Sequence, residues 1–284
     1  MAVAVCLMSF PLRASGRRPP ELRFELDPST VTAGRTLVVR FHSPARIMNP
    51  RMTLNDRSAE FYSVSTGSWR AFWGISCQES PGVKNARFEV LWNKRVIVST
   101  ISFTVEAGTF PVSHIPLTKS QNNLFTSGQL TDDNEILAAA YKKAPIPRKM
   151  WSGYFVWPTT GVVSSVFGAR RSYGRRPPGS GHSGMDIANV EGTLITAPAR
   201  GRVVLSRRLD SFGNAVVLEH GQGVFTYYLH MVKPLAKEGD FLEVGSPIGL
   251  MGKEGIATGP HLHWSMVVSG ERVDPREWTE RLFD

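Results

Sequence analysis

The chain has 284 residues, and its content of 42% hydrophobic and 20% charged residues is ordinary for a globular protein that buries a core. The formal net charge of +9 favours an anionic partner such as nucleic acid, a membrane surface or an acidic cell-wall polymer. No helix-turn-helix, zinc-finger or RNP-like motif occurs, so a nucleic-acid partner is not expected, and no run of about 18 apolar residues predicts a membrane-spanning helix.

The first segment, residues 1–16, has the composition of a leader. It is mostly apolar and then reaches the small residues Ala14-Ser15-Gly16, like the core and cleavage region of a signal peptide. No basic residue precedes the apolar core, so we expect a weak or truncated signal peptide, and the alternative is an apolar start that packs on the first domain. Removal of this segment would leave Cys77 without Cys6, so no disulfide is predicted.

Residues 20–106 contain short β-prone runs separated by turn residues. Leu37, Val39 and Phe41 share one face of their run, so at least that face should be buried. Short strands at this spacing predict an antiparallel β-sandwich of immunoglobulin-like type, which could bind the wall or a partner protein, or cover an active site. Three tryptophans could stack on sugar rings, but the core is the expected place for at least two of them: Trp69, Trp73 and Trp92.

Residues 107–150 form a connecting segment with one short helix. The acidic run 132–135 fits a capping-box start, and Pro145 and Pro147 follow the basic end of the helix. Four apolar residues would form one stripe of the helix: Ile136, Leu137, Ala140 and Tyr141. We expect this helix to pack between the two flanking domains, where it is also a candidate for a piece that blocks an active site.

Residues 151–284 are again mainly β-prone, and a basic loop from Arg170 to Arg176 carries Tyr173. A run of charges usually forms a solvated face. Because this loop precedes His182 by a few residues, Arg170 and Tyr173 are also candidates for contact with substrate.

Histidines and a carboxylate recur along this part in a pattern that suits a metal site. His182 and Asp186 are four apart with a glycine between them, and His230 ends an aromatic, β-prone run. His261 and His263 lie two apart on a predicted strand, so both side chains would project from the same face. Catalytic zinc sites use three protein ligands and leave a fourth position open. A purely structural zinc site would favour four ligands and cysteine, and neither cysteine lies near these motifs.

The motifs His-x-Gly-x-Asp, Tyr-x-His and Gly-Pro-His-Leu-His, in this order, resemble those of the lysostaphin-type (LytM-like) zinc endopeptidases that cut peptidoglycan peptides. The resemblance covers about half of the chain, from Trp151 to Trp278, and implies an antiparallel β-sheet peptidase domain. It also implies one zinc ion per chain, held by His182, Asp186 and His263.

The same resemblance implies catalytic roles for the two remaining histidines. His261 would act as the general base on water, and His230 would donate a hydrogen bond to the developing oxyanion, although the two roles could be exchanged. Tyr228, two residues before His230 on the predicted strand, could help to shape the site for substrate.

We therefore expect an endopeptidase that hydrolyses stem peptides or cross-links of bacterial peptidoglycan in the cell envelope, in the periplasm or after secretion. The alternative is a catalytically silent regulator that binds the wall, or activates another hydrolase, on the same fold. A regulator would normally have lost a metal ligand, whereas all five motif positions match the family pattern here.

Overall fold

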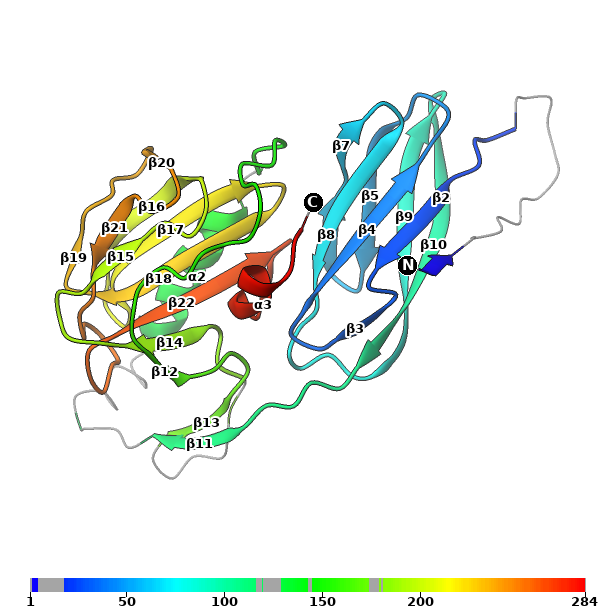
Figure 1. The fold of residues 1–284 in the computed structure, drawn as a ribbon. Coiled ribbons are helices and arrows are strands. Elements are labelled where there is room, and N and C mark those ends of the chain that lie inside the picture. The colour runs from blue at the N-terminus through cyan, green and yellow to red at the C-terminus, as the bar shows by residue number, and fades with distance from the viewer. Residues whose placement is uncertain are drawn as a thin grey trace.

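The computed structural model describes residues 2–4, 18–115, 119, 129–142, 145–173, 179 and 181–283. Strands dominate it, and Figure 1 shows them in two groups, an N-terminal pair of sheets and a C-terminal set of sheets that carries the helices. The mainly β fold predicted from the sequence is confirmed. Within the described residues, no helix is long and apolar enough to cross a membrane.

The N-terminal strands form two five-stranded sheets, which we call the sandwich. The first sheet has the order β1 (Ala2–Ala4), β2 (Arg23–Asp27), β4 (Thr36–His42), β8 (Ser68–Gly74) and β7 (Tyr62–Ser65). The second has the order β3 (Thr30–Thr32), β10 (Arg95–Glu106), β9 (Gly82–Trp92), β5 (Met48–Leu54) and β6 (Arg57–Glu60). The neighbouring strands are antiparallel except β3 and β10, which run parallel. The immunoglobulin-like type of this sandwich stays a prediction.

Apolar side chains from both sheets fill the interior of the sandwich. Phe24 and Phe41 of the first sheet lie 5.0 and 5.1 Å, between ring centroids, from Phe88 of the second, in edge-to-face contacts that aromatic rings prefer. Trp73 and Trp92 are buried in this core, so the placement predicted for at least two tryptophans is confirmed.

The start of the chain adds strand β1 to the edge of the first sheet. Its residues Ala2–Ala4 pair antiparallel with Phe24–Leu26 of β2. Residues 5–16, the remainder of the predicted leader, lie outside the described residues, so the signal peptide stays a prediction.

The connection between the two parts contains a strand as well as a helix. β11 (Val112–Ile115) runs parallel to β13 (Arg170–Tyr173), which anchors the connection on the C-terminal part. α2 (Gln129–Lys142) begins before the capping box predicted at Asp132. The carboxylate of Asp133 accepts a hydrogen bond from the Ser211 N–H at 2.6 Å, so this acid serves a tertiary contact that a local capping pattern does not reveal.

The sequence predicted that α2 packs between the two parts of the chain. In the structure it packs on the C-terminal sheet instead. Leu137 and Ala140 are buried in one cluster with Phe225 and Tyr227. In Figure 1 the helix lies behind the C-terminal strands, on the far face of their sheet in this view. The prediction failed because the apolar stripe specifies only that the helix is buried on one side, whatever covers that side.

The C-terminal strands form an eight-stranded antiparallel sheet and a small three-stranded sheet. The large sheet has the order β12 (Val162–Ser165), β14 (Met185–Ala188), β22 (His261–Val268), β18 (Val224–Met231), β17 (Gly213–Gly221), β16 (Gly201–Leu209) and β20 (Phe241–Leu242), with β23 (Glu271–Val273) beside β22. The small sheet has the order β15 (Leu194–Thr196), β21 (Pro247–Leu250) and β19 (Lys233–Pro234). The helix α3 (Pro275–Glu280) follows β23.

A buried aromatic cluster joins the sandwich to the C-terminal part. Phe72 of the sandwich lies 5.6 Å from Trp151 and 5.8 Å from Trp278, measured between ring centroids. The indole N–H of Trp278 donates to Thr36 Oγ1 at 3.2 Å, and the Thr36 N–H donates to a Glu277 carboxylate oxygen at 2.9 Å. Both parts therefore contribute to one apolar core with satisfied polar groups.

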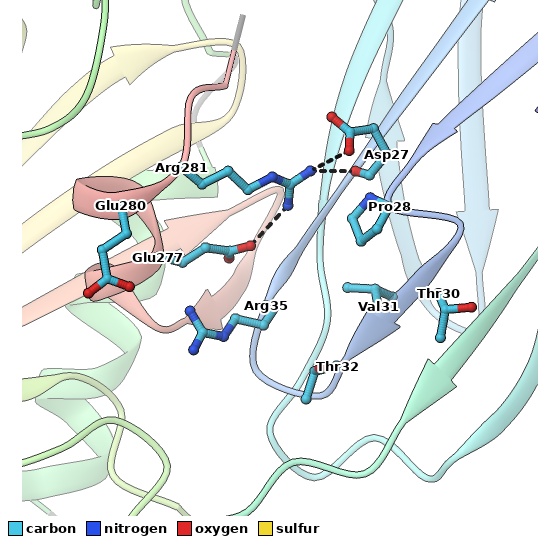
Figure 2. A pocket seen from close by; sticks show the side chains of 9 residues that line it. All are labelled: Asp27, Pro28, Thr30, Val31, Thr32, Arg35, Glu277, Glu280 and Arg281. Carbon is cyan, nitrogen blue, oxygen red and sulfur yellow. Dashed lines mark hydrogen bonds and ion pairs between the residues drawn. The ribbon is translucent and has the colours of Figure 1, made fainter. Parts of the chain in front are cut away.

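An open pocket of 350 Å³ lies beside this contact, between the sandwich and α3. Figure 2 shows Arg281 at its edge, where the guanidinium bridges Asp27 of the sandwich and Glu277 of α3. The charges that line the pocket are thus largely engaged in holding the two parts together.

Candidate metal centre

Three predicted ligands meet at the pairing of two strands in the large sheet. Asp186 of β14 lies directly opposite His263 of β22, and His182 lies four residues before Asp186, just ahead of β14. Asp186 Oδ1 is 2.9 Å from His263 Nδ1 and 3.1 Å from His182 Nε2, and the two imidazole nitrogens are 2.9 Å apart. The predicted ligand set is thus brought together in one buried cluster.

Glycine at position 184 allows this approach. A Cβ atom built there would lie 2.4 Å from the Trp264 carbonyl oxygen and 2.8 Å from His263 Nε2, much closer than real Cβ atoms come. The glycine of the His-x-Gly-x-Asp motif is therefore required by contact with β22.

The donor atoms of the cluster suit a cation. His182 Nδ1 lies 3.0 Å from the Val166 carbonyl oxygen, which can only accept, so in the neutral ring Nδ1 carries the proton and Nε2 offers its lone pair. Two nitrogens and a carboxylate oxygen facing one another form a ligand set that Zn²⁺ prefers.

The two remaining histidines lie beside this cluster. The rings of His230 and His261 are 4.8 Å apart, and His261 Nε2 is 3.8 Å from Asp186 Oδ1. His230 Nδ1 lies 2.7 Å from the Glu254 carbonyl oxygen, and His261 Nδ1 lies 2.9 Å from that of Gly259. Both neutral rings therefore carry the proton on Nδ1 and keep Nε2 as a hydrogen-bond acceptor.

Burial, aided by the nearby His261 and His263, lowers the pKa of His230 to about 3. A neutral His230 with its proton directed to Glu254 has no N–H left for an oxyanion. The donor role predicted for His230 therefore requires that Nε2 first take up a proton, whereas an acceptor role is available at once.

The three residues predicted to contact substrate, Tyr228, Arg170 and Tyr173, lie in different surroundings. Tyr228 is fully buried in the core on the opposite face of the sheet, where its hydroxyl lies 2.8 Å from Thr226 Oγ1, so its predicted contact with substrate does not fit. Arg170 is exposed and its backbone pairs with Gly181, next to His182. Tyr173 ends β13, but its side chain lies outside the described part of the chain.

Sequence reasoning missed Tyr227, the residue before Tyr228. Tyr227 lies opposite Ser265, its ring stacks with that of His263 at 6.5 Å between centroids, and its hydroxyl accepts from Arg272 Nε at 2.7 Å. Counting by two from His230 selected Tyr228 because an extended strand alternates, but His230 has a φ of +64° and leaves that conformation. No local pattern in the sequence identifies Tyr227, because only the pairing of β18 with β22 places it beside His263.

Comparisons with known proteins agree with this geometry. The profile described as Peptidase family M23 matches residues 180–275, which contain all five site residues. Peptidoglycan DD-endopeptidase ShyA of Vibrio cholerae is 36% identical over 152 residues, which are 53% of this chain and 33% of that protein. Murein hydrolase activator EnvC of Escherichia coli is 33% identical over 129 residues, which are 45% of this chain and 30% of that protein.

A crystal structure from Pseudomonas aeruginosa that is described as a peptidase M23 covers 89% of this chain and 96% of its own, with a TM-score of 0.62 and 24% sequence identity. That likeness shows the fold of both parts. The chain matches about a third of the length of the curated relatives. Residues 180–275 of this chain, which hold the His182, Asp186 and His263 cluster, therefore match the lysostaphin-type (LytM-like) peptidase family M23.

Proposed function

We propose that the chain is a zinc-dependent endopeptidase that hydrolyses peptide bonds in the stem peptides or cross-links of bacterial peptidoglycan. One observation carries the proposal: the converging donor atoms of His182, Asp186 and His263 lie next to two imidazoles whose Nε2 atoms are acceptors. A metal site that only stabilised the fold would not need two such bases beside it.

His182, Asp186 and His263 would hold the zinc ion, which when bound lowers the pKa of water and polarises the scissile carbonyl. His261 Nε2 accepts a proton from the attacking water and later returns it to the leaving amine. His230 Nε2 accepts the second hydrogen bond of that water and thereby orients it. The Nδ1 bonds to the Gly259 and Glu254 carbonyls fix both rings for these tasks.

Several features support a substrate in the bacterial wall. The net charge of +9 suits an anionic polymer. The exposed Arg170 also lies near the site, because its backbone pairs with Gly181, the residue before His182. Two of the relatives are named as peptidoglycan DD-endopeptidases, so their names give peptidoglycan as their own substrate. We therefore propose an envelope location, with Arg170 and Tyr173 as substrate contacts and the sandwich as the surface for a wall polymer or partner protein.

The test is zinc content and turbidity clearing of purified peptidoglycan by the intact chain and by His263→Ala. We expect one zinc per chain and clearing, both lost in the variant, because His263 supplies a ligand from the centre of the cluster. His42→Ala, which removes an exposed histidine of the sandwich, is the matched control and should keep both. A chain that binds no zinc would contradict the proposal.

A second candidate is an activator of another wall hydrolase, which the similarity to a protein named as a murein hydrolase activator supports. An activator would bind zinc or none, would not clear peptidoglycan, and would accelerate clearing by a separate hydrolase. The presence of all five motif residues favours the enzyme.

A further inference from the structure

Ser265 lies on β22, two residues after His263 and on the same face of the strand. Its hydroxyl contacts the ring of His263 on the side that faces away from Asp186. Ser265 Oγ is 2.8 Å from His263 Nε2, the ring nitrogen that faces away from Asp186. The side chain of Ser265 is fully buried, so no bulk water competes for this contact.

The direction of this hydrogen bond follows from counting protons. Ser265 Oγ also lies 2.9 Å from the main-chain carbonyl oxygen of Ser183, which can only accept, so the single hydroxyl proton of Ser265 is directed there. Toward His263 the same oxygen must therefore accept, which places the ring proton on Nε2.

A proton on Nε2 leaves the lone pair of a neutral imidazole on Nδ1. That nitrogen is the one that lies 2.9 Å from both Asp186 Oδ1 and His182 Nε2. The opposite tautomer would turn an N–H toward the position of the cation and could not bind it.

The protein holds this arrangement by close packing. A Cβ atom at Gly184 would lie 2.3 Å from Ser265 Oγ, so the glycine leaves the space that the hydroxyl fills. The hydroxyl of Ser183, at 3.3 Å from His263 Nε2, is a longer and weaker partner.

We propose that Ser265 is a positioning residue that fixes His263 in its zinc-binding tautomer, with the Ser183 carbonyl as its anchor. This inference rests on the proposed function only through the assignment of His263 as a zinc ligand. Partners behind a ligand histidine usually orient the ring and raise its affinity for metal.

The first test is the zinc affinity of Ser265→Ala, measured by competition with a chromophoric chelator. We expect affinity to fall by about 10–100-fold, the usual cost of losing such a partner. Ser269→Ala removes a hydrogen-bonded serine from the same end of the chain, where Oγ donates to the Phe72 carbonyl at 2.7 Å, and should leave affinity unchanged. An affinity of Ser265→Ala within about twofold of the unaltered chain would overturn the proposal.

The second test reads the ring protons of His263 from long-range ¹H–¹⁵N NMR spectra of the zinc-loaded chain, because without the cation the Asp186 carboxylate, 2.9 Å from Nδ1, would itself attract a proton to that nitrogen. We expect zinc on Nδ1 and a slowly exchanging proton on Nε2 in the unaltered protein, and faster exchange of that proton with water in Ser265→Ala. A purely structural role would leave this exchange unchanged. Finding zinc on Nε2 and the proton on Nδ1 in the unaltered chain would overturn the inference without any variant.

These readouts separate the inference from the proposed function. If the chain binds zinc in a Ser265-dependent manner but does not clear peptidoglycan, the proposed function fails and the inference stands. If the chain clears peptidoglycan and Ser265→Ala keeps its zinc affinity, the inference alone fails.

Discussion

A main-chain carbonyl faces Nδ1 of four histidines in the C-terminal part and thereby decides which nitrogen of the neutral ring carries the proton. The four pairs are His182 with Val166, His220 with Arg200, His230 with Glu254 and His261 with Gly259. His263 is different, because its Nδ1 points to Asp186 and its Nε2 to Ser265. The side chain of Ser265 thus does for His263 what the backbone does for the other rings.

His220 is the histidine of this group that takes no part in the site, and it should make the fold sensitive to acid. Burial lowers its pKa to about 4, below the value of about 6.5 in an unfolded chain. As the pH falls, the unfolded chain therefore takes up the proton first, and stability is lost between pH 6.5 and pH 4.

We expect this residue alone to lower the free energy of unfolding by about 2 kcal/mol between pH 7 and pH 5. His220→Gln should be less stable at pH 7, since a buried hydrogen bond is altered, but should lose less stability on acidification. Urea unfolding at the two pH values measures both, and His42→Gln, at an exposed position, should behave as the unaltered chain does. Equal losses in His220→Gln and the unaltered chain would contradict the prediction.

The strands of the large sheet place the site on the same face that α2 covers. Leu229 lies opposite His263, and Tyr227 lies opposite Ser265, so these four side chains share a face. Leu137 of α2 is buried in the cluster that contains Tyr227 and Leu229. The helix therefore covers the same face of the sheet as the metal ligand, in one cluster with Tyr227 and Leu229, and we predict that it restricts access to the site.

Loosening the N-terminal half of α2 should expose this surface and speed hydrolysis of peptidoglycan. Asp133→Ala removes the buried carboxylate that accepts from Ser211, at a cost of about 1–3 kcal/mol in local stability. Asp132→Ala, which alters the exposed acid next to Asp133 in the chain, is the control. We expect the rate of clearing to rise only for Asp133→Ala. A rate equal to that of the control would show that α2 is no barrier.

The sandwich and the C-terminal part share a core, so they should unfold together. Phe72 is 1% exposed and packs against Trp151, Trp278 and Phe283 across the contact. Burial raises the pKa of Glu277, although Arg281 opposes it, and the Thr36 N–H and Arg281 both bond its carboxylate. Such a contact resembles a domain core more than a flexible joint.

Phe72→Ala should lower the stability of both parts by about 3–5 kcal/mol, the usual cost of a buried phenylalanine. Calorimetry should show one unfolding transition in the unaltered chain and a lower midpoint in the variant. Tyr154→Ala removes an aromatic ring that is 51% exposed and should leave the midpoint nearly unchanged. Two well-separated transitions in the unaltered chain would instead mean that the parts are independent.

Residue identity and local spacing were enough to predict the mainly β fold, and the resemblance of the ordered motifs to the lysostaphin-type family nominated the metal and catalytic residues. His182, Asp186 and His263 can be recognised in this way because ligand chemistry belongs to the residue type, and because a strand places residues two apart on one face. Strand runs are visible for the same reason, since each depends on a short stretch of β-prone residues.

Only the tertiary structure decided which side chains surround that centre. The choice of Tyr227 over Tyr228 depends on the backbone at His230, whose φ of +64° breaks the alternation of the strand. Which nitrogen of each ring carries the proton depends on carbonyls and on the Ser265 hydroxyl, which the pairing of distant strands brings into place. The packing position of α2 depends on an apolar surface that several strands form together. No local pattern records such contacts, because their partners meet only when the chain folds.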